Sequence, residues 1–280
     1  MRPTSRVRAC SNNQQSEYHP NFQTSPIRRH NRAETFRNAC QTVNGNLLRL
    51  VYIVKSKLDN FEQRAAIRNS WGFEKRFSDV PIRTVFILGV EETKSTLQKK
   101  VEEESKIHND IVQADFIDTY FNNTIKTMMG IQWAVRFCKN SKFYFFSDDD
   151  ISFNSLTTRN LKQVLDFELP DDVKLFAGYV FFSSPHRHYP SKWYVTLAEY
   201  PFHMWPPYVT LFTKHFRFDD IYLGLLAKKM DLEPFHCDEF HFYKKAYNHF
   251  NYRYVITSHG YDDPDELLKV WNEQKSAGNA

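Results

Sequence analysis

Two short runs of apolar residues constrain the fold of this chain more than any other feature of its sequence. Residues 47–55 (LLRLVYIVK) and 82–89 (IRTVFILG) are rich in β-branched and aliphatic side chains over the length of a single strand. Such continuous runs are typical of strands buried on both faces, as in parallel sheets covered by helices. Because a polar stretch of helical character separates the runs, the sequence predicts a strand–helix–strand unit.

The same alternation continues toward the C-terminus. The expected elements are a charged helix over 91–108, a strand over 110–118, a helix over 123–138, a strand at 142–146, a helix over 155–167 and a strand over 174–182. This order predicts an α/β fold with a mostly parallel sheet flanked by helices. Within the helix over 123–138, Ile125, Met129 and Trp133 recur every four residues, which indicates a helix face that packs into the core.

Residues 1–46 differ from the rest of the chain in composition. They are polar, rich in Arg, Asn, Gln and Ser, and lack sustained periodicity, so we expect a disordered arm before one domain over 47–280. No signal peptide is visible, and no window has the apolar length of a transmembrane segment. The net charge is only +4, with Lys and Arg scattered among 33 acidic residues, so nothing in the charge demands a nucleic-acid partner.

The four cysteines, Cys10, Cys40, Cys138 and Cys237, lie far apart and form no CxxC pair. This spacing argues against a structural zinc site. Two alternatives stay open, namely buried free thiols or one bridge between Cys138 and Cys237.

Three consecutive carboxylates, Asp148, Asp149 and Asp150, follow the apolar strand at 142–146. Adjacent like charges repel, so a partner should offset their cost. Ligands of open α/β sheets bind outside the carboxyl ends of the strands, where such acids can diverge and hold Mg²⁺ or Mn²⁺ through oxygen ligands. The alternative is a solvated acidic turn that caps the helix expected from Ser155. The position directly after an apolar strand favours the functional interpretation.

Seven motifs, in order, resemble those of the Golgi β-1,3-glycosyltransferases, which include β-1,3-galactosyltransferases and β-1,3-N-acetylglucosaminyltransferases. The resemblance extends from residue 47 to the C-terminus. The matching segments are RAAIRNSWG (64–72), VFILG (85–89), DIVQADFIDTYFNNTIKT (110–127), DDDISFN (148–154), KWYV with YP (192–195 and 200–201), WPPY (205–208) and DDIYLG (219–224).

This resemblance implies a GT-A type, Rossmann-like nucleotide-sugar-binding fold and a Mn²⁺ cofactor. The implied reaction is the inverting transfer of galactose or an N-acetylhexosamine from a UDP-sugar donor to a glycan acceptor, in β-1,3 linkage, on a glycoprotein or glycolipid. Membrane association and a lumenal Golgi location are also implied, although this chain shows no membrane anchor.

On the donor side, the resemblance implies that Asp150 and His259 bind the metal. Asp148 and Asp149 would hold metal-bound water or the ribose, and Arg64 and Arg68 would bind the nucleotide. The two arginines are four residues apart and therefore lie on one helix face, from which they could reach a nucleotide. Without the resemblance, a solvated arginine pair and a surface histidine would be the simpler interpretations.

On the acceptor side, Asp220 matches the acid that we expect to act as the general base toward the attacking hydroxyl. Trp205, Tyr208 and Asp219 match neighbouring acceptor-side positions, with Asp219 supporting the loop. The alternative for the two acids is an N-cap before a helix over 221–230. Asn122 begins the sequon NNT, so we expect glycosylation there if the chain enters the secretory pathway.

One departure from the family pattern bears on activity. Only ten residues, 209–218, separate WPPY from DDIYLG, whereas family members have a longer stretch there. Because this stretch positions the proposed base, its short length favours an alternative in which the chain binds UDP-sugar or metal but does not transfer the sugar. A third hypothesis is a metal-dependent phosphate-ester hydrolase that uses the same carboxylates, but no acids or histidines for a second metal stand near DDDISFN.

Overall fold

The computed structural model describes residues 48–76, 81–91, 96–119, 122–153, 175–191, 193–209 and 219–278. The expected arm over 1–46, the helix over 155–167 and the segment 210–218 lie outside these residues. No helix of the described part combines the length and the hydropathy that a membrane crossing requires.

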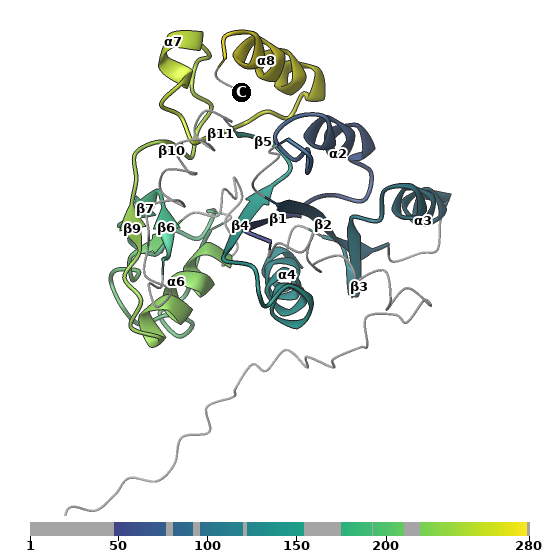
Figure 1. Cartoon of the computed structure of the whole chain (residues 1–280). Coiled ribbons are helices and arrows are strands. Elements are labelled where there is room, and N and C mark those ends of the chain that lie inside the picture. The colour runs from purple at the N-terminus through teal and green to yellow at the C-terminus, as the bar shows by residue number, and fades with distance from the viewer. Residues whose placement is uncertain are drawn as a thin grey trace, which may run out of the picture.

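A four-stranded parallel sheet forms the centre of the structure (Figure 1). Its strands are β1 (Leu50–Lys55), β2 (Ile82–Val90), β3 (Ile111–Ile117) and β4 (Phe143–Asp148), in the order β3-β2-β1-β4. All three neighbouring pairs are parallel. Strand β1 is buried along its whole length, which confirms the strand type predicted from its continuous apolar run.

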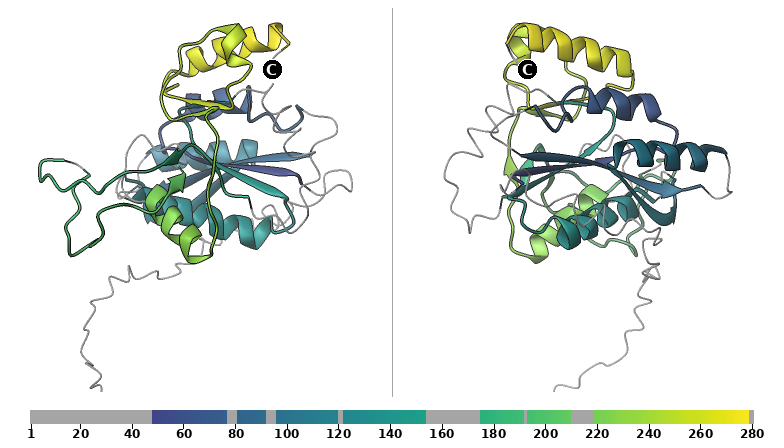
Figure 2. Two further views of the ribbon diagram at one scale, coloured as in Figure 1. Left: turned by 90° about the vertical axis from the view of Figure 1, so that its left-hand side faces the viewer. Right: turned by 45° about the vertical axis from the view of Figure 1, so that its right-hand side comes forward.

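Helices cover both faces of this sheet, which confirms the predicted α/β fold. Helices α2 (Phe61–Arg68) and α3 (Thr96–His108) lie over one face, and α4 (Asn123–Phe137) lies over the other (Figure 1). Helix α8 (Pro264–Ser276) packs outside α2, whereas α6 (Asp219–Lys229) packs beside α4 (Figure 2).

The hydrophobic core is split by the sheet, because successive side chains of a strand point to opposite faces. Leu50, Tyr52 and Val54 of β1 pack in the core on the α2 face. Val51 and Ile53 pack on the α4 face, in the cluster that contains Trp133. The core position predicted for Trp133 is therefore confirmed.

The run over 174–182 does not form one strand of the main sheet, so this prediction is wrong. Instead, β6 (Ala177–Gly178) pairs with β9 (Phe235–His236), and β7 (Val180–Phe181) pairs antiparallel with β8 (Tyr208–Val209). Tyr179 and Phe181 both pack against Phe242. Gly178 and Val180 are buried, whereas Leu175 and Phe182 are exposed, so the apolar composition indicated burial for only part of this run.

A three-stranded sheet continues the chain after the acidic triplet. It contains β5 (Ile151–Phe153), β10 (Phe240–His241) and β11 (Thr257–His259), in the order β10-β11-β5, and α7 (His249–Tyr252) lies between β10 and β11 in sequence. Antiparallel pairing of β5 with β11 places His259 opposite Ile151. This pairing brings a residue from the end of the chain next to the triplet.

Of the two alternatives for the cysteines, the bridge between Cys138 and Cys237 is wrong, and the free thiol is wrong for Cys138. Cys138 is disulfide-bonded, but Cys237 is a free thiol. The two residues belong to different parts of the fold: Cys138 is buried with Leu48 at the end of α4, whereas the Cys237 Sγ donates a hydrogen bond to Glu239. Burial and that contact raise the pKa of Cys237 to about 12, so this thiol is protonated at neutral pH.

Candidate active site

The acidic triplet lies at the carboxyl end of β4, where its side chains diverge. Parallel pairing puts Lys55, the last residue of β1, beside Asp148 of β4. Because side chains alternate along a strand, Lys55 and Asp148 point to the α4 face, whereas Ser56 and Asp149 point to the α2 face. The sequence-based expectation that the three acids diverge at a strand end is therefore confirmed.

Lys55 is the cation at the centre of the α4 side of the site. Its Nζ lies 3.1 Å from Asp148 Oδ1 and 2.7 Å from Asp219 Oδ2, and only 3% of the residue is exposed. Burial alone lowers the pKa of Lys55, but Asp148, Asp219 and Asp220 together reverse this and raise it. Lys55 therefore remains charged and joins β1, β4 and α6.

The carboxylates around Lys55 outnumber it. We call Lys55, Asp148, Asp150, Asp219 and Asp220 the acid-rich cluster, which contains one ammonium and four carboxylates. Burial raises the pKa of Asp148 well above its ordinary value; Lys55 opposes this shift, whereas Asp150 and Asp219 add to it. Acidic groups thus crowd together at the carboxyl edge of the sheet, where an additional cation would favour their ionised forms.

The structure brings together the two residues expected to bind the metal. His259 Nε2 lies 3.3 Å from Asp150 Oδ2, and both side chains are largely buried. The backbone N–H of Tyr261 donates to the Asp150 carbonyl at 2.8 Å, which fixes the chain on the β11 side. No group of three or more possible metal ligands occurs among the described residues. Asp150 and His259 are therefore in contact, and metal binding by this pair stays a prediction.

Asp149 has a different environment from its two neighbours. Its Oδ2 accepts hydrogen bonds from Ser56 Oγ at 2.6 Å and from Asn60 Nδ2 at 2.9 Å. The Gln63 side chain donates to the Asp149 carbonyl at 2.8 Å. These contacts hold Asp149 against the start of α2, and the contact with a nucleotide sugar that the sequence predicts for it stays a prediction.

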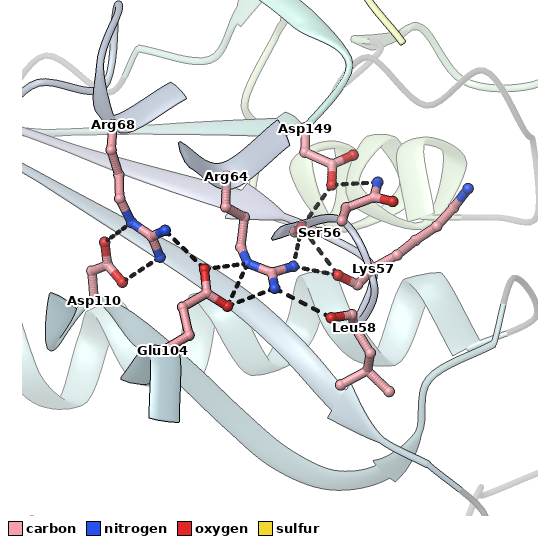
Figure 3. Close-up of polar contacts among 9 residues, drawn as sticks. Ser56, Lys57, Leu58, Arg64, Arg68, Glu104, Asp110 and Asp149 are labelled. Atoms are coloured by element: carbon pink, nitrogen blue, oxygen red, sulfur yellow. Dashed lines mark hydrogen bonds and ion pairs between the residues drawn. The ribbon is translucent and has the colours of Figure 1, made fainter. Parts of the chain in front are cut away.

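Arg64 and Arg68 project from α2 into a buried ion network (Figure 3). Arg64 is fully buried; it donates to both oxygens of Glu104, to Ser56 Oγ at 3.1 Å and to the carbonyls of Lys57 and Leu58. The alternative of a solvated helix face is therefore wrong for this residue. Since Ser56 also holds Asp149, Arg64 supports the loop between β1 and α2 and, through it, the triplet.

Arg68 completes this network with a second carboxylate. Its Nε and Nη2 donate to Asp110 at 2.6 and 2.9 Å, and its Nη1 donates to Glu104 at 2.8 Å. Although burial alone would raise the pKa of Glu104, the two guanidinium groups lower it. We call Arg64, Arg68, Glu104 and Asp110 the balanced cluster, because two guanidinium groups face two carboxylates. A direct contact of either arginine with a nucleotide stays a prediction.

Asp219 and Asp220 lie inside the first turn of α6, so the helix begins earlier than the expected N-cap arrangement requires. Both are buried, at 1% and 3% exposure. Asp219 Oδ2 accepts from Lys55 and from the Thr127 hydroxyl at 2.7 and 2.9 Å. Asp219 therefore connects α6 to the main sheet and α4, which is a closer link than the loop support expected from the sequence.

Trp205 and Tyr208 pack against α6. They are buried in one cluster with Val195 and Ile221, and the Tyr208 hydroxyl lies 2.8 Å from Ser183 Oγ. Burial raises the pKa of Tyr208; the hydrogen bond with Ser183 opposes this, and the charge of Asp220 adds to it. A Cβ at Gly224 would lie 2.7 Å from the Tyr208 Cβ, so the glycine in DDIYLG allows this close packing.

Asn122 directly precedes α4, and its Nδ2 donates to the Ile117 carbonyl at 2.8 Å. Glycosylation would require this amide nitrogen to leave that contact. Modification of the sequon stays a prediction.

Comparison with known proteins places these features in a wider context. A model of the family described as galactosyltransferase matches residues 62–212. The chain is 44% identical over 256 residues to the β-1,3-galactosyltransferase brn of Drosophila melanogaster, covering 83% of this chain and 76% of that protein. It is 33% identical over 274 residues to β-1,3-galactosyltransferase 1 of Mus musculus, covering 91% and 82%. Similarity therefore extends well beyond the segments that contain the motifs.

Proposed function

The chain belongs to the galactosyltransferase family and has its GT-A-like fold, and we propose that it transfers galactose from a UDP-sugar to a glycan in β-1,3 linkage. The single observation that supports this most is the acid-rich cluster at the carboxyl edge of the sheet, which is the edge where ligands of such sheets bind.

Mn²⁺ fits the residues at this edge. Asp150 supplies an oxygen donor and His259 a nitrogen donor, a combination that Mn²⁺ accepts, and the excess of carboxylates favours a divalent cation. Asp150 and His259 would hold the ion, and oxygens of the UDP-sugar and of water would complete its coordination. When bound, the ion neutralises charge on the departing diphosphate. Asp149 and the loop after β1, fixed by Arg64, would then form the side of the site that faces the nucleotide.

Asp220 would act as the general base. It lies buried at the start of α6, next to Asp219, and a carboxylate there can accept the proton of the attacking glycan hydroxyl. Inversion requires the hydroxyl to approach from the side opposite to the diphosphate. Trp205 and Tyr208 would contribute by holding α6 rather than by touching the sugar, since both are buried.

We further propose that the protein acts in the lumen of the secretory pathway, in association with the Golgi membrane, on glycan chains of glycoproteins or glycolipids. The disulfide at Cys138 supports an oxidising compartment. The sequon at Asn122 is compatible with the same location.

A panel of UDP-sugars, assayed with and without Mn²⁺, tests this proposal. We expect turnover with UDP-galactose that depends on Mn²⁺. Asp150→Ala should abolish nucleotide binding, whereas Asp220→Ala should retain binding and lose transfer by about 10²- to 10⁴-fold. Asp115→Asn is the control, since Asp115 is an exposed acid of β3 outside both clusters. The opposite assignment of binding and transfer to the two acids would reject the roles, and binding without any turnover would support the non-catalytic alternative.

A further inference from the structure

Lys55 connects two parts of the site that would have different tasks. Its Nζ contacts Asp148 on β4, beside the proposed metal, and Asp219 on α6, beside the proposed base. We infer that Lys55 is a positioning residue that fixes the base-bearing helix α6 against the donor-side strand β4. This inference rests on the proposed function and deepens it.

The contacts of Asp219 explain why a single ammonium can have this effect. The hydrogen bonds from Lys55, Thr127 and Asn123 are all made to Oδ2, at 2.7, 2.9 and 3.4 Å, and within the described part of the chain the buried Oδ1 has no hydrogen-bond partner. The carboxylate is therefore held from one side, by the end of β1 and by α4. Loss of Lys55 would remove the ion pair by which β1 holds the Asp219 carboxylate.

The helix transmits this restraint from Asp219 to Asp220. The two residues are adjacent in the first turn of α6, where their side chains point about 100° apart. Fixing Asp219 therefore sets the rotation of the helix end and the direction of Asp220. Because reactions lose rate steeply when reacting groups are misplaced by about 1 Å, this restraint should affect transfer more than donor binding.

A second buried lysine provides a matched control. Lys126 Nζ lies 2.6 Å from Asp118 Oδ1 and 2.7 Å from the Ser56 carbonyl, and it is almost as buried as Lys55. Both of these partners lie outside α6. Removal of Lys126 should therefore destabilise the fold, as removal of any buried ion-pair partner does, without altering the angle of α6.

Steady-state kinetics on the Mn²⁺-loaded protein separate the two possibilities. For Lys55→Met we expect kcat of transfer to fall about 10²-fold, with the donor KM and the affinity for UDP changed by less than about threefold. Lys55→Arg should recover part of kcat. Lys126→Met should lower the melting temperature and leave the ratio of kcat to UDP affinity unchanged. A parallel loss of UDP affinity in Lys55→Met, or the same selective loss of kcat in Lys126→Met, would overturn the inference.

A double-mutant cycle keeps the test valid if Lys55→Met is poorly folded. Lys55→Met with Asp219→Asn removes both charges of the pair, so the double variant should lose no more activity than the worse single variant. If the activity losses of the two single variants multiply in the double variant, Lys55 does not act through Asp219. A parent protein without Mn²⁺-dependent transfer would overturn the proposed function and this inference together, whereas an active parent with multiplicative losses overturns the inference alone.

Discussion

The balanced cluster and the acid-rich cluster lie on opposite faces of the same sheet, on either side of the end of β1, and they differ in charge. In the balanced cluster two guanidinium groups meet two carboxylates through paired hydrogen bonds. In the acid-rich cluster the Lys55 ammonium interacts with Asp148, Asp219 and Asp220, and Asp150 adds a fourth acid beside Asp148. The pKa of Asp148 is raised by burial and by its acidic neighbours. We therefore interpret the balanced cluster as part of the structural framework, whereas the acid-rich cluster is where we propose that a cation binds.

The alternation of side chains along β1 and β4 produces this division. Ser56 and Asp149 lie on the face where Arg64 donates hydrogen bonds to the loop after β1. Lys55 and Asp148 lie on the face covered by α4 and α6. Repulsion between adjacent acids costs free energy, so the surrounding structure must hold them in place. Here the balanced cluster supplies part of that support through Ser56.

The largest effect on stability should come from Glu104→Ala. This change leaves two buried guanidinium groups without their shared carboxylate, and we expect the free energy of unfolding to fall by about 3–5 kcal/mol. Urea unfolding monitored by circular dichroism measures it. Glu103→Ala is the control, because Glu103 is an exposed neighbour on α3. A loss below about 1 kcal/mol would show that the cluster is not the support described here.

The second-largest effect should be a loss of unfolding free energy at low pH, caused by protonation of Glu104 in the balanced cluster. The pKa of Glu104 is lowered in the folded state, so its stabilising contribution is present above the ordinary value of 4.5 and is lost as the pH falls through the folded pKa. Unfolding free energies measured between about pH 6 and pH 3 should therefore fall less steeply in Glu104→Gln than in the parent. Equal slopes would contradict the assignment of this acid sensitivity to Glu104.

Asp148→Asn should have the opposite sign. A raised carboxyl pKa favours folding below the ordinary value of 3.8, and this contribution is lost as the pH rises through the folded pKa. At pH 7, without metal, the variant should be more stable than the parent by about 1 kcal/mol, and its Mn²⁺-dependent transfer should be weaker. Asp149→Asn is the matched neighbour and should be destabilising, since Asp149 accepts from Ser56 and Asn60. If Asp148→Asn were less stable than the parent, the Asp148 carboxylate would be stabilising in the metal-free protein, contrary to this prediction.

The smallest effect should come from a partly exposed pair outside both clusters. Arg83 and Glu74 lie 3.0 Å apart with side chains 19% and 35% exposed. We expect Arg83→Met to cost less than about 1 kcal/mol and to leave Mn²⁺ dependence unchanged, as is usual for exposed ion pairs. Thermal unfolding and the transfer assay check this. An effect as large as that of Glu104→Ala would remove the contrast between buried and exposed pairs.

Local patterns in the sequence predicted the main sheet well. Strands β1 and β2 follow from continuous apolar runs, and α4 follows from the spacing that buries Trp133. The place of the triplet at the end of β4 followed from the same logic. The pairing of Asp150 with His259 came from the family resemblance, because no local pattern connects residues so far apart in the chain.

Contacts between residues far apart in the chain could not be predicted from the sequence. Lys55 ends an otherwise apolar run, a signal that could have drawn notice, but its contacts depend on the register of β1 with β4 and on the placement of α6. In the same way, the spacing of Arg64 and Arg68 indicated a shared face but not that Glu104 of α3 would cover it. For the run over 174–182, composition indicated burial but not which strand it would join.

Isothermal titration calorimetry with Mn²⁺ and UDP tests the central claim most directly, namely that the acid-rich cluster holds a divalent cation together with the nucleotide. We predict Mn²⁺-dependent binding heat for the parent, its loss in Asp150→Ala, and its retention in Glu104→Gln at a temperature where that variant is folded. Equal heats for the parent and Asp150→Ala, or no heat for the parent, would contradict the account.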